Sequence, residues 1–82
     1  MTIPLYGFVE GDTLGVLVIG HADMTIGEVI ARLSDAVSTR VDPKGPWQLF
    51  ARDVALEQLN KTVADVGLDA FERIDLRRAA RT

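Results

Sequence analysis

Residues 61–76, KTVADVGLDAFERIDL, constrain the fold of this 82-residue chain more than any other segment. Thr62 and Asp65 stand three residues apart, which is the spacing of a helix-capping box, and Gly67 stands where a short helical turn can end with positive φ. Charged and apolar residues then alternate over residues 73–77. Such alternation is typical of a strand with one buried face. The segment therefore predicts a short capped helical turn followed by a final strand whose inward side chains are Ile74 and Leu76.

The N-terminal residues predict a β-hairpin. Residues 3–9 and 14–19 are rich in β-branched and aromatic residues, and they flank a polar loop, EGDT, that contains a glycine. If Val9 pairs with Leu14, side chains at alternate positions share a face. One face then carries Leu5, Val9, Leu14, Val16 and Val18. The other face carries Tyr6, Phe8, Leu17 and Ile19. Both faces of the hairpin are therefore predicted to be apolar.

A helix is predicted after the hairpin. Thr25 can cap it, and Glu28 completes a capping box three residues later. Apolar residues then recur at spacings of three and four, which suits a helix with one buried side. The inward stripe is Ile26, Val29, Ile30, Leu33 and Val37.

The segment DPKGP, residues 42–46, interrupts all regular structure after the helix. Residues 47–52 predict a third strand, in which Trp47 and Leu49 face opposite to Gln48 and Phe50. Residues 54–56 continue as a weaker fourth strand.

The predicted order is strand, strand, helix, strand, short strand, short helix, strand, which is the order of a β-grasp. It makes the first and last strands neighbours in a mixed sheet wrapped over one helix. We therefore expect an α+β fold, a ubiquitin-like β-grasp with four to five strands, one main helix and a second short helical turn. The domain is expected to span residues 1–77, with residues 78–82 as a flexible tail. The predicted core consists of Val16, Val18, Ile26, Val29, Leu33, Leu68, Ile74 and Leu76.

Two pieces of the sequence resemble ubiquitin itself. Thr25-Ile26-x-x-Val29-x-x-x-Leu33 is similar to the entry of the ubiquitin helix, and Thr62-Val63-x-Asp65-x-x-Leu68 is similar to its late capped turn. Together with the final Ile74-x-Leu76, these two pieces cover most of the framework of the ubiquitin fold.

Composition narrows the classes of partner. Charged residues make up 26% of the chain and the net charge is −3, so there is no basic field for the phosphates of nucleic acid. The longest apolar run, residues 14–20, is far shorter than the roughly 20 residues that span a bilayer, and the N-terminus does not resemble a signal peptide. Zero cysteines fit a reducing compartment, so the chain is expected in the cytoplasm.

The small size itself points to a protein partner. A domain of this length removes only about 60% of its unfolded surface from water. Domains this small commonly gain stability from a disulfide, a metal or a partner. With no cysteine and one histidine in the chain, a partner is the option that remains.

Two activities of related folds do not suit this sequence. A ubiquitin-like modifier or sulfur carrier must end in Gly-Gly, whereas this chain ends Arg-Arg-Ala-Ala-Arg-Thr. A β-grasp ferredoxin holds its iron–sulfur cluster with cysteine thiolates, and the chain has none.

No segment predicts a catalytic, metal or cofactor site in this chain. His21 stands beside Asp23 but without a second organised group, so we interpret it as a loop histidine near a helix start. Glu10 and Asp12 are too few carboxylates for a calcium loop and suit turn chemistry. A small basic tail could be a solvated end or could bind an acidic groove of a partner; it consists of Arg77, Arg78 and Arg81.

The outer face of the hairpin, Tyr6, Phe8, Leu17 and Ile19, is the best candidate for a functional surface. In a β-grasp the helix covers one face of the sheet and the other face meets water. Four large apolar side chains there would form an exposed patch of a few hundred Å², which indicates a partner-docking site. Two alternatives remain: the hairpin register is shifted by one residue, or the long loop and Trp47 cover the patch.

The chain also resembles, nearly end to end, the small B, or gamma, subunit of the toluene and alkene monooxygenases, soluble bacterial di-iron enzymes of several components. The resemblance rests on the joint order of short pieces and not on a catalytic motif. It departs from the family pattern at residues 35–38 and 54–60. The pieces are Ile3-Pro4-Leu5, Asp12-x-Leu14-x-x-Leu17-Val18, Asp23-Met24-Thr25-Ile26-x-Glu28-Val29, Arg40-Val41-x-Pro43 and Thr62-Val63-Ala64-Asp65-x-Gly67-Leu68-x-x-x-Glu72-x-Ile74-Asp75.

The resemblance implies a non-catalytic structural subunit. In that family the small subunit has a ubiquitin-like fold and packs against the large hydroxylase chain, which holds the di-iron site and the hydrocarbon pocket. A second hypothesis is a stand-alone ubiquitin-like adaptor, such as those associated with bacterial secretion systems. Both are binding roles, and no residues support a small enzyme. The hydrocarbon substrate cannot be read from this chain.

Overall fold

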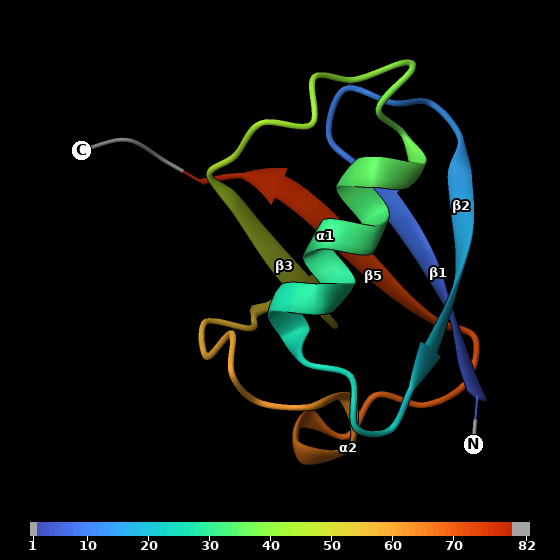
Figure 1. Ribbon diagram of the computed structural model, residues 1–82, viewed down its shortest axis with the longest axis vertical. Coiled ribbons are helices and arrows are strands. Elements are labelled where there is room, and N and C mark those ends of the chain that lie inside the picture. Colours follow the sequence, from blue (N-terminus) through green and yellow to red (C-terminus); the bar gives the residue numbers. More distant parts are fainter. Residues whose placement is uncertain (1, 80–82) are drawn as a thin grey trace.

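The computed structural model describes residues 2–79, and its elements follow the predicted order. The strands are β1 (Thr2–Val9), β2 (Gly15–His21), β3 (Trp47–Ala51), β4 (Val54–Ala55) and β5 (Glu72–Arg78), and the helices are α1 (Ile26–Ala36) and α2 (Val63–Val66). The sheet order is β2-β1-β5-β3-β4. β1 and β5 are parallel, and the other neighbouring pairs are antiparallel. In Figure 1, α1 crosses in front of the sheet. The predicted β-grasp is confirmed.

The hairpin has the predicted register. Tyr6 lies opposite Leu17 and Leu5 lies opposite Val18, so the two faces are divided as the alternation predicts. Two residues that were predicted to face the core are not fully buried. Leu14 is exposed, because β2 begins only at Gly15, and Val16 is partly buried at the margin of the core.

Both predicted capping boxes are present. The hydroxyl oxygen of Thr25 accepts the backbone N–H of Glu28 at 3.2 Å, and the Glu28 carboxylate accepts the N–H of Thr25 at 3.3 Å. At α2, the Thr62 hydroxyl oxygen accepts the N–H of Asp65 at 3.0 Å. Gly67 ends α2 with φ of 73°, in the left-handed conformation that favours glycine. Local sequence therefore sets where both helices begin and where α2 ends.

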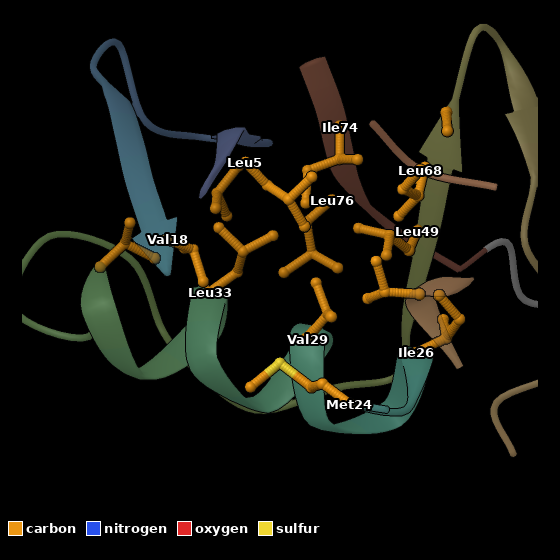
Figure 2. Packing of buried hydrophobic residues seen from close by; sticks show 14 residues of the cluster. Leu5, Val18, Met24, Ile26, Val29, Leu33, Leu49, Leu68, Ile74 and Leu76 are labelled. Carbon is orange, nitrogen blue, oxygen red and sulfur yellow. The ribbon is translucent and has the colours of Figure 1, made fainter. Parts of the chain in front are cut away.

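The core lies between the sheet and α1 (Figure 2). All predicted core residues except Val16 are buried, and within the helical stripe only Ile30 is partly exposed. The helix approaches β1 closely at Gly7, where an added Cβ would clash with Leu33 Cδ2. The buried cluster is Leu5, Val9, Val18, Met24, Ile26, Val29, Leu33, Val37, Leu49, Ala51, Val63, Leu68, Ile74 and Leu76.

The last strand runs one residue further than predicted. Arg78, which was predicted to lie in the tail, pairs with Trp47 of β3. Its guanidinium stacks over the indole ring at 3.8 Å and donates to the backbone carbonyl oxygens of Asp42 and Lys44. Arg78 therefore holds the loop before β3 against the sheet. Ala79, also predicted in the tail, donates its N–H to the carbonyl oxygen of Pro46 at 3.1 Å. The last three predicted tail residues, 80–82, lie outside the described residues.

An ion pair joins the hairpin loop to the segment after α1. Arg40 donates from Nε and Nη2 to the carboxylate of Asp12, with an Nη2–Oδ2 distance of 2.9 Å. The loop N–H of Leu14 also donates to Asp12. The interpretation of Asp12 as a turn residue is therefore confirmed. The Arg40 hydrogen bond is the main reason that the pKa of Asp12 lies below its usual 3.8.

Acid is expected to weaken this link. A carboxyl group whose pKa is lowered by folding adds stability above its unfolded pKa, and that stability is lost as the pH falls through the folded value. The urea midpoint of the wild type should therefore fall more between about pH 4 and pH 2 than that of Asp12→Asn. Glu57→Gln, which changes an exposed side chain, is the matched control. An equal fall in the wild type and Asp12→Asn would contradict this role.

Candidate partner-docking surface

The outer hairpin face is largely open to solvent. Tyr6, Leu17 and Ile19 keep 47%, 49% and 44% of their surface exposed. Tyr6 and Leu17 are direct cross-strand neighbours, and Pro4 lies opposite Ile19. β1 and β2 therefore present a continuous apolar surface on the side of the sheet away from α1.

Phe8 belongs to the same face but is half-buried. It lies opposite Gly15, where an added Cβ would come within 2.9 Å of the Phe8 ring. On its other side, the Arg73 guanidinium lies 4.2 Å from the ring centroid. Phe8 thus fills the space that Gly15 leaves, beneath Arg73, and less of it is available to a partner than of the other three residues.

The loop before β3, which contains residues 42–46, does not cover this surface. Trp47 lies in β3, partly buried against the core, and its indole N–H donates to the carbonyl oxygen of Pro43 at 2.9 Å. The register is the predicted one. Both alternatives to an exposed apolar patch are therefore excluded by the structure.

Toward β5 and β3, the outer face carries charged side chains in place of apolar ones. Arg77 stacks over Phe50 at 4.3 Å, as Arg73 does over Phe8. A shallow hollow beside β5 is lined mainly by charged side chains. These charges pair among themselves: Arg73 with Asp75 at 3.1 Å, Arg77 with Asp53 at 3.5 Å and Arg52 with Glu72 at 2.8 Å. This half of the face is polar and internally neutralised, so the apolar half over β1 and β2 is the better docking surface.

The other sequence candidates do not assemble with one another. His21 is exposed at the end of β2, and its backbone carbonyl accepts the N–H of Met24. Glu10 is exposed after β1, with its backbone N–H bonded to Leu76. Arg77 and Arg78 belong to β5 and stack on aromatic rings, so they do not form a free basic tail. Arg81 lies outside the described residues.

Sequence reasoning missed Phe71. This residue is 63% exposed and has φ of 63°, a conformation that is rare for an aromatic residue. Its N–H donates to the carbonyl oxygen of Pro4 at 2.6 Å, which fixes the turn before β5 beside the start of β1. No local pattern marks such a residue, because its conformation depends on the pairing of β1 with β5.

Within residues 2–79, no three histidine, cysteine or acidic side chains converge as a metal site would require. In the same residues, no helix has the length and apolar character needed to cross a membrane.

Of three comparisons with known proteins, one relates this chain to others. No protein-family model and no curated protein sequence matches it. Among solved structures, a chain of the toluene 4 monooxygenase HD complex with the inhibitor 4-bromobenzoate matches with a TM-score of 0.85 and 23% identity. That match covers 96% of this chain and 100% of the other, and it agrees with the resemblance seen in the sequence.

Two ubiquitin-like structures match as well. Ubiquitin of Caldiarchaeum subterraneum matches with a TM-score of 0.74 and 13% identity, over 99% of this chain and 98% of that chain. The ubiquitin-like domain of an Arabidopsis thaliana protein matches with a TM-score of 0.68 and 15% identity, over 99% of this chain and 85% of that chain. The chain has the ubiquitin-like β-grasp fold that these structures share.

Proposed function

We propose that this chain is a non-catalytic structural subunit of a bacterial multicomponent di-iron monooxygenase that acts on aromatic or alkene hydrocarbons in the cytoplasm. The observation that carries the proposal is the match to a chain of the toluene 4 monooxygenase HD complex, at a TM-score of 0.85 over the whole of that chain. The short pieces of sequence that resemble the small subunits of such enzymes also support it.

In this proposal the outer hairpin face docks on the large catalytic chain. Tyr6, Leu17 and Ile19 are large, apolar and exposed on adjacent strands, which is the composition expected at the centre of an interface. The di-iron centre and the hydrocarbon pocket belong to the large chain. The small chain contributes buried apolar surface to the assembly.

The alternative is a stand-alone ubiquitin-like adaptor of a bacterial secretion system or another protein complex. The matches to ubiquitin-like structures suit this alternative as well. The neighbouring genes separate the two. An oxygenase large chain with two Glu-x-x-His motifs favours the first, and secretion ATPases favour the second.

Co-expression with the hydroxylase chains encoded beside this one tests the proposal. The tagged chain is expected to retain the large chain through affinity and size-exclusion steps, with iron in the complex and none in the chain purified alone. Elemental analysis of both fractions, after dialysis, measures the iron. Failure of the large chain to co-purify, or stoichiometric iron in the isolated chain, would contradict the proposal.

A further inference from the structure

Arg78 differs from the other arginines of β5 in what its guanidinium binds. Arg73 pairs with the carboxylate of Asp75. Arg77 pairs with the carboxylate of Asp53. Within residues 2–79, Arg78 forms no ion pair, and its acceptors are backbone carbonyl oxygens of the loop before β3. These oxygens come within its reach only while that loop lies against the sheet. The contacts of Arg78 therefore depend on the conformation of the loop.

Arg78 lies at the end of the inward-facing row of β5. Ile74 and Leu76, which precede it at alternate positions, are buried in the core, and alternate residues of a strand share a face. Arg78 pairs with Trp47, which packs against the core from β3. The guanidinium lies 3.8 Å from the centroid of the indole ring. An arginine thus takes the place of a further apolar side chain where the core ends.

The loop of residues 42–46, which we call the strap, runs from the segment after α1 to the start of β3, beside the end of β5 (Figure 1). All five of its residues are exposed, so it has no buried apolar anchor. Its backbone carbonyl oxygens hold it instead. Two of them accept from the Arg78 guanidinium, one accepts from the indole N–H of Trp47 at 2.9 Å, and one accepts from the N–H of Ala79 at 3.1 Å. The acceptors are, in the same order, Asp42 and Lys44, Pro43, and Pro46.

The hydrogen bonds of the strap depend on one another. The three donor residues, Trp47, Arg78 and Ala79, lie at or beside the pair formed by the first residue of β3 and the last residue of β5. Arg78 supplies two of the bonds and stacks on the indole ring that supplies another. A segment with few buried apolar contacts and solvent-exposed hydrogen bonds opens at a lower free energy than the core. The strap therefore has the features of a unit that opens locally, and Arg78 contributes most to keeping it closed.

We propose that the strap is a conformational device with a closed and an open state, and that Arg78 holds it closed. In the open state, residues 42–46 leave the end of the sheet as one unit, the indole ring of Trp47 is uncovered, and the sheet stays intact. The device couples the C-terminal end of β5 to residues that lie 34 and 36 positions earlier in the sequence. A change at that end of β5 is thereby transmitted to the loop. The inference goes beyond the proposed function and does not depend on it, because every contact lies within this chain.

Hydrogen exchange of the wild-type chain, followed by NMR at increasing urea concentrations, tests the open state. The indole N–H of Trp47, which is the only tryptophan, and the amide of Ala79 report the strap. The slowest amides of β1 and β5 report global unfolding. Relative to their intrinsic rates, both strap signals should exchange at least about tenfold faster than these amides. Their exchange should depend only weakly on urea, because local opening exposes little surface. Strap signals that exchange only through global unfolding, with the same urea dependence as β1 and β5, would overturn the inference.

Variants of two adjacent arginines isolate the role of the Arg78 guanidinium. Arg78→Ala removes two hydrogen bonds, so exchange at both strap signals should rise about fivefold to a hundredfold relative to the slowest amides. Arg78→Lys keeps the charge but replaces the planar fork of donors with one ammonium group, and it should show a smaller rise. Arg77→Ala is the matched control, because it removes an arginine that stacks on Phe50 on the opposite face of the sheet. It should leave the strap signals unchanged.

Circular dichroism checks that the variants are folded. Unchanged exchange of the strap signals in folded Arg78→Ala would overturn the inference. Equal increases in Arg78→Ala and Arg77→Ala would overturn it as well, because they would assign the effect to a general loosening of β5. If Arg78→Ala is unfolded, the wild type and Arg78→Lys decide.

Discussion

Leu33→Ala is expected to lower the free energy of unfolding by about 2–5 kcal/mol. Leu33 is fully buried in α1 and lies against Gly7 of β1. Truncation removes apolar contacts and leaves a cavity between the helix and the sheet that close packing can only partly fill. Because native proteins are stable by only about 5–15 kcal/mol, this loss is a large fraction of the total free energy of unfolding. Urea unfolding followed by circular dichroism measures it. A loss under about 0.5 kcal/mol, the level typical of surface substitutions, would contradict the assigned helix face.

Gly7, against which Leu33 packs, provides a second test of the same contact. Gly7→Ala adds a methyl group that would clash with Leu33 Cδ2 and lie 3.2 Å from Cγ, so overpacking should cost about 1–3 kcal/mol. In the Leu33→Ala background that clash is absent. Gly7→Ala should then be nearly neutral, with a coupling between the two sites of about 1–3 kcal/mol.

Gly27→Ala is the control for the glycine substitution. Gly27 lies in α1, where an added Cβ would meet the Leu59 carbonyl oxygen at an ordinary contact distance of 3.5 Å. Replacement should stabilise the helix by up to about 1 kcal/mol. If Gly7→Ala lowers the free energy of unfolding and Gly27→Ala raises it, then close packing against Leu33, and not glycine replacement itself, causes the loss at Gly7. Additive losses for Gly7→Ala and Leu33→Ala would contradict the contact.

The sequence predicted the elements whose signals are local. The capping boxes at Thr25 and Thr62, the glycine that ends α2 and the alternation in β5 all appear where expected, because each depends on residues within one helical turn or one strand. The hairpin register was also predictable, since polar loop residues and apolar arms admit few pairings. Together these signals define the β-grasp order.

Features that depend on distant residues were not predictable in this way. Leu14 was expected inside, but Asp12 turns the loop with its pairing to Arg40, 28 residues away, and β2 begins only after Leu14. Phe8 was expected to be exposed to solvent, but Arg73 of the last strand lies over its ring. The conformation of Phe71 likewise follows from the pairing of β1 with β5. Alternation did indicate the side of the sheet on which Phe50 lies, opposite to Leu49, but not the arginine that stacks on it.

If the chain is the proposed oxygenase subunit, Leu17→Asp is expected to remove it from the complex while leaving its fold nearly intact. Leu17 is half-exposed and lies opposite Tyr6 on the outer face, so in the free chain the new carboxylate stays in water. The poor strand propensity of aspartate costs at most about 1 kcal/mol there. In the complex, the same carboxylate would be an unpaired charge in a desolvated contact, at a cost of several kcal/mol.

A loss of about 3 kcal/mol in binding free energy already weakens binding more than a hundredfold, so the hydroxylase activity of the proposed complex should fall through loss of assembly. The measurement is co-expression with the proposed large chain, affinity pull-down, and circular dichroism of the isolated variant. Val54→Asp is the matched control, because it introduces the same charge at an apolar side chain that is 62% exposed on β4, at the opposite edge of the sheet. Co-purification should survive in Val54→Asp and fail in Leu17→Asp. Normal co-purification of Leu17→Asp would remove the outer hairpin face as the interface, and failure of both variants would point to the overall charge of the chain and not to this surface.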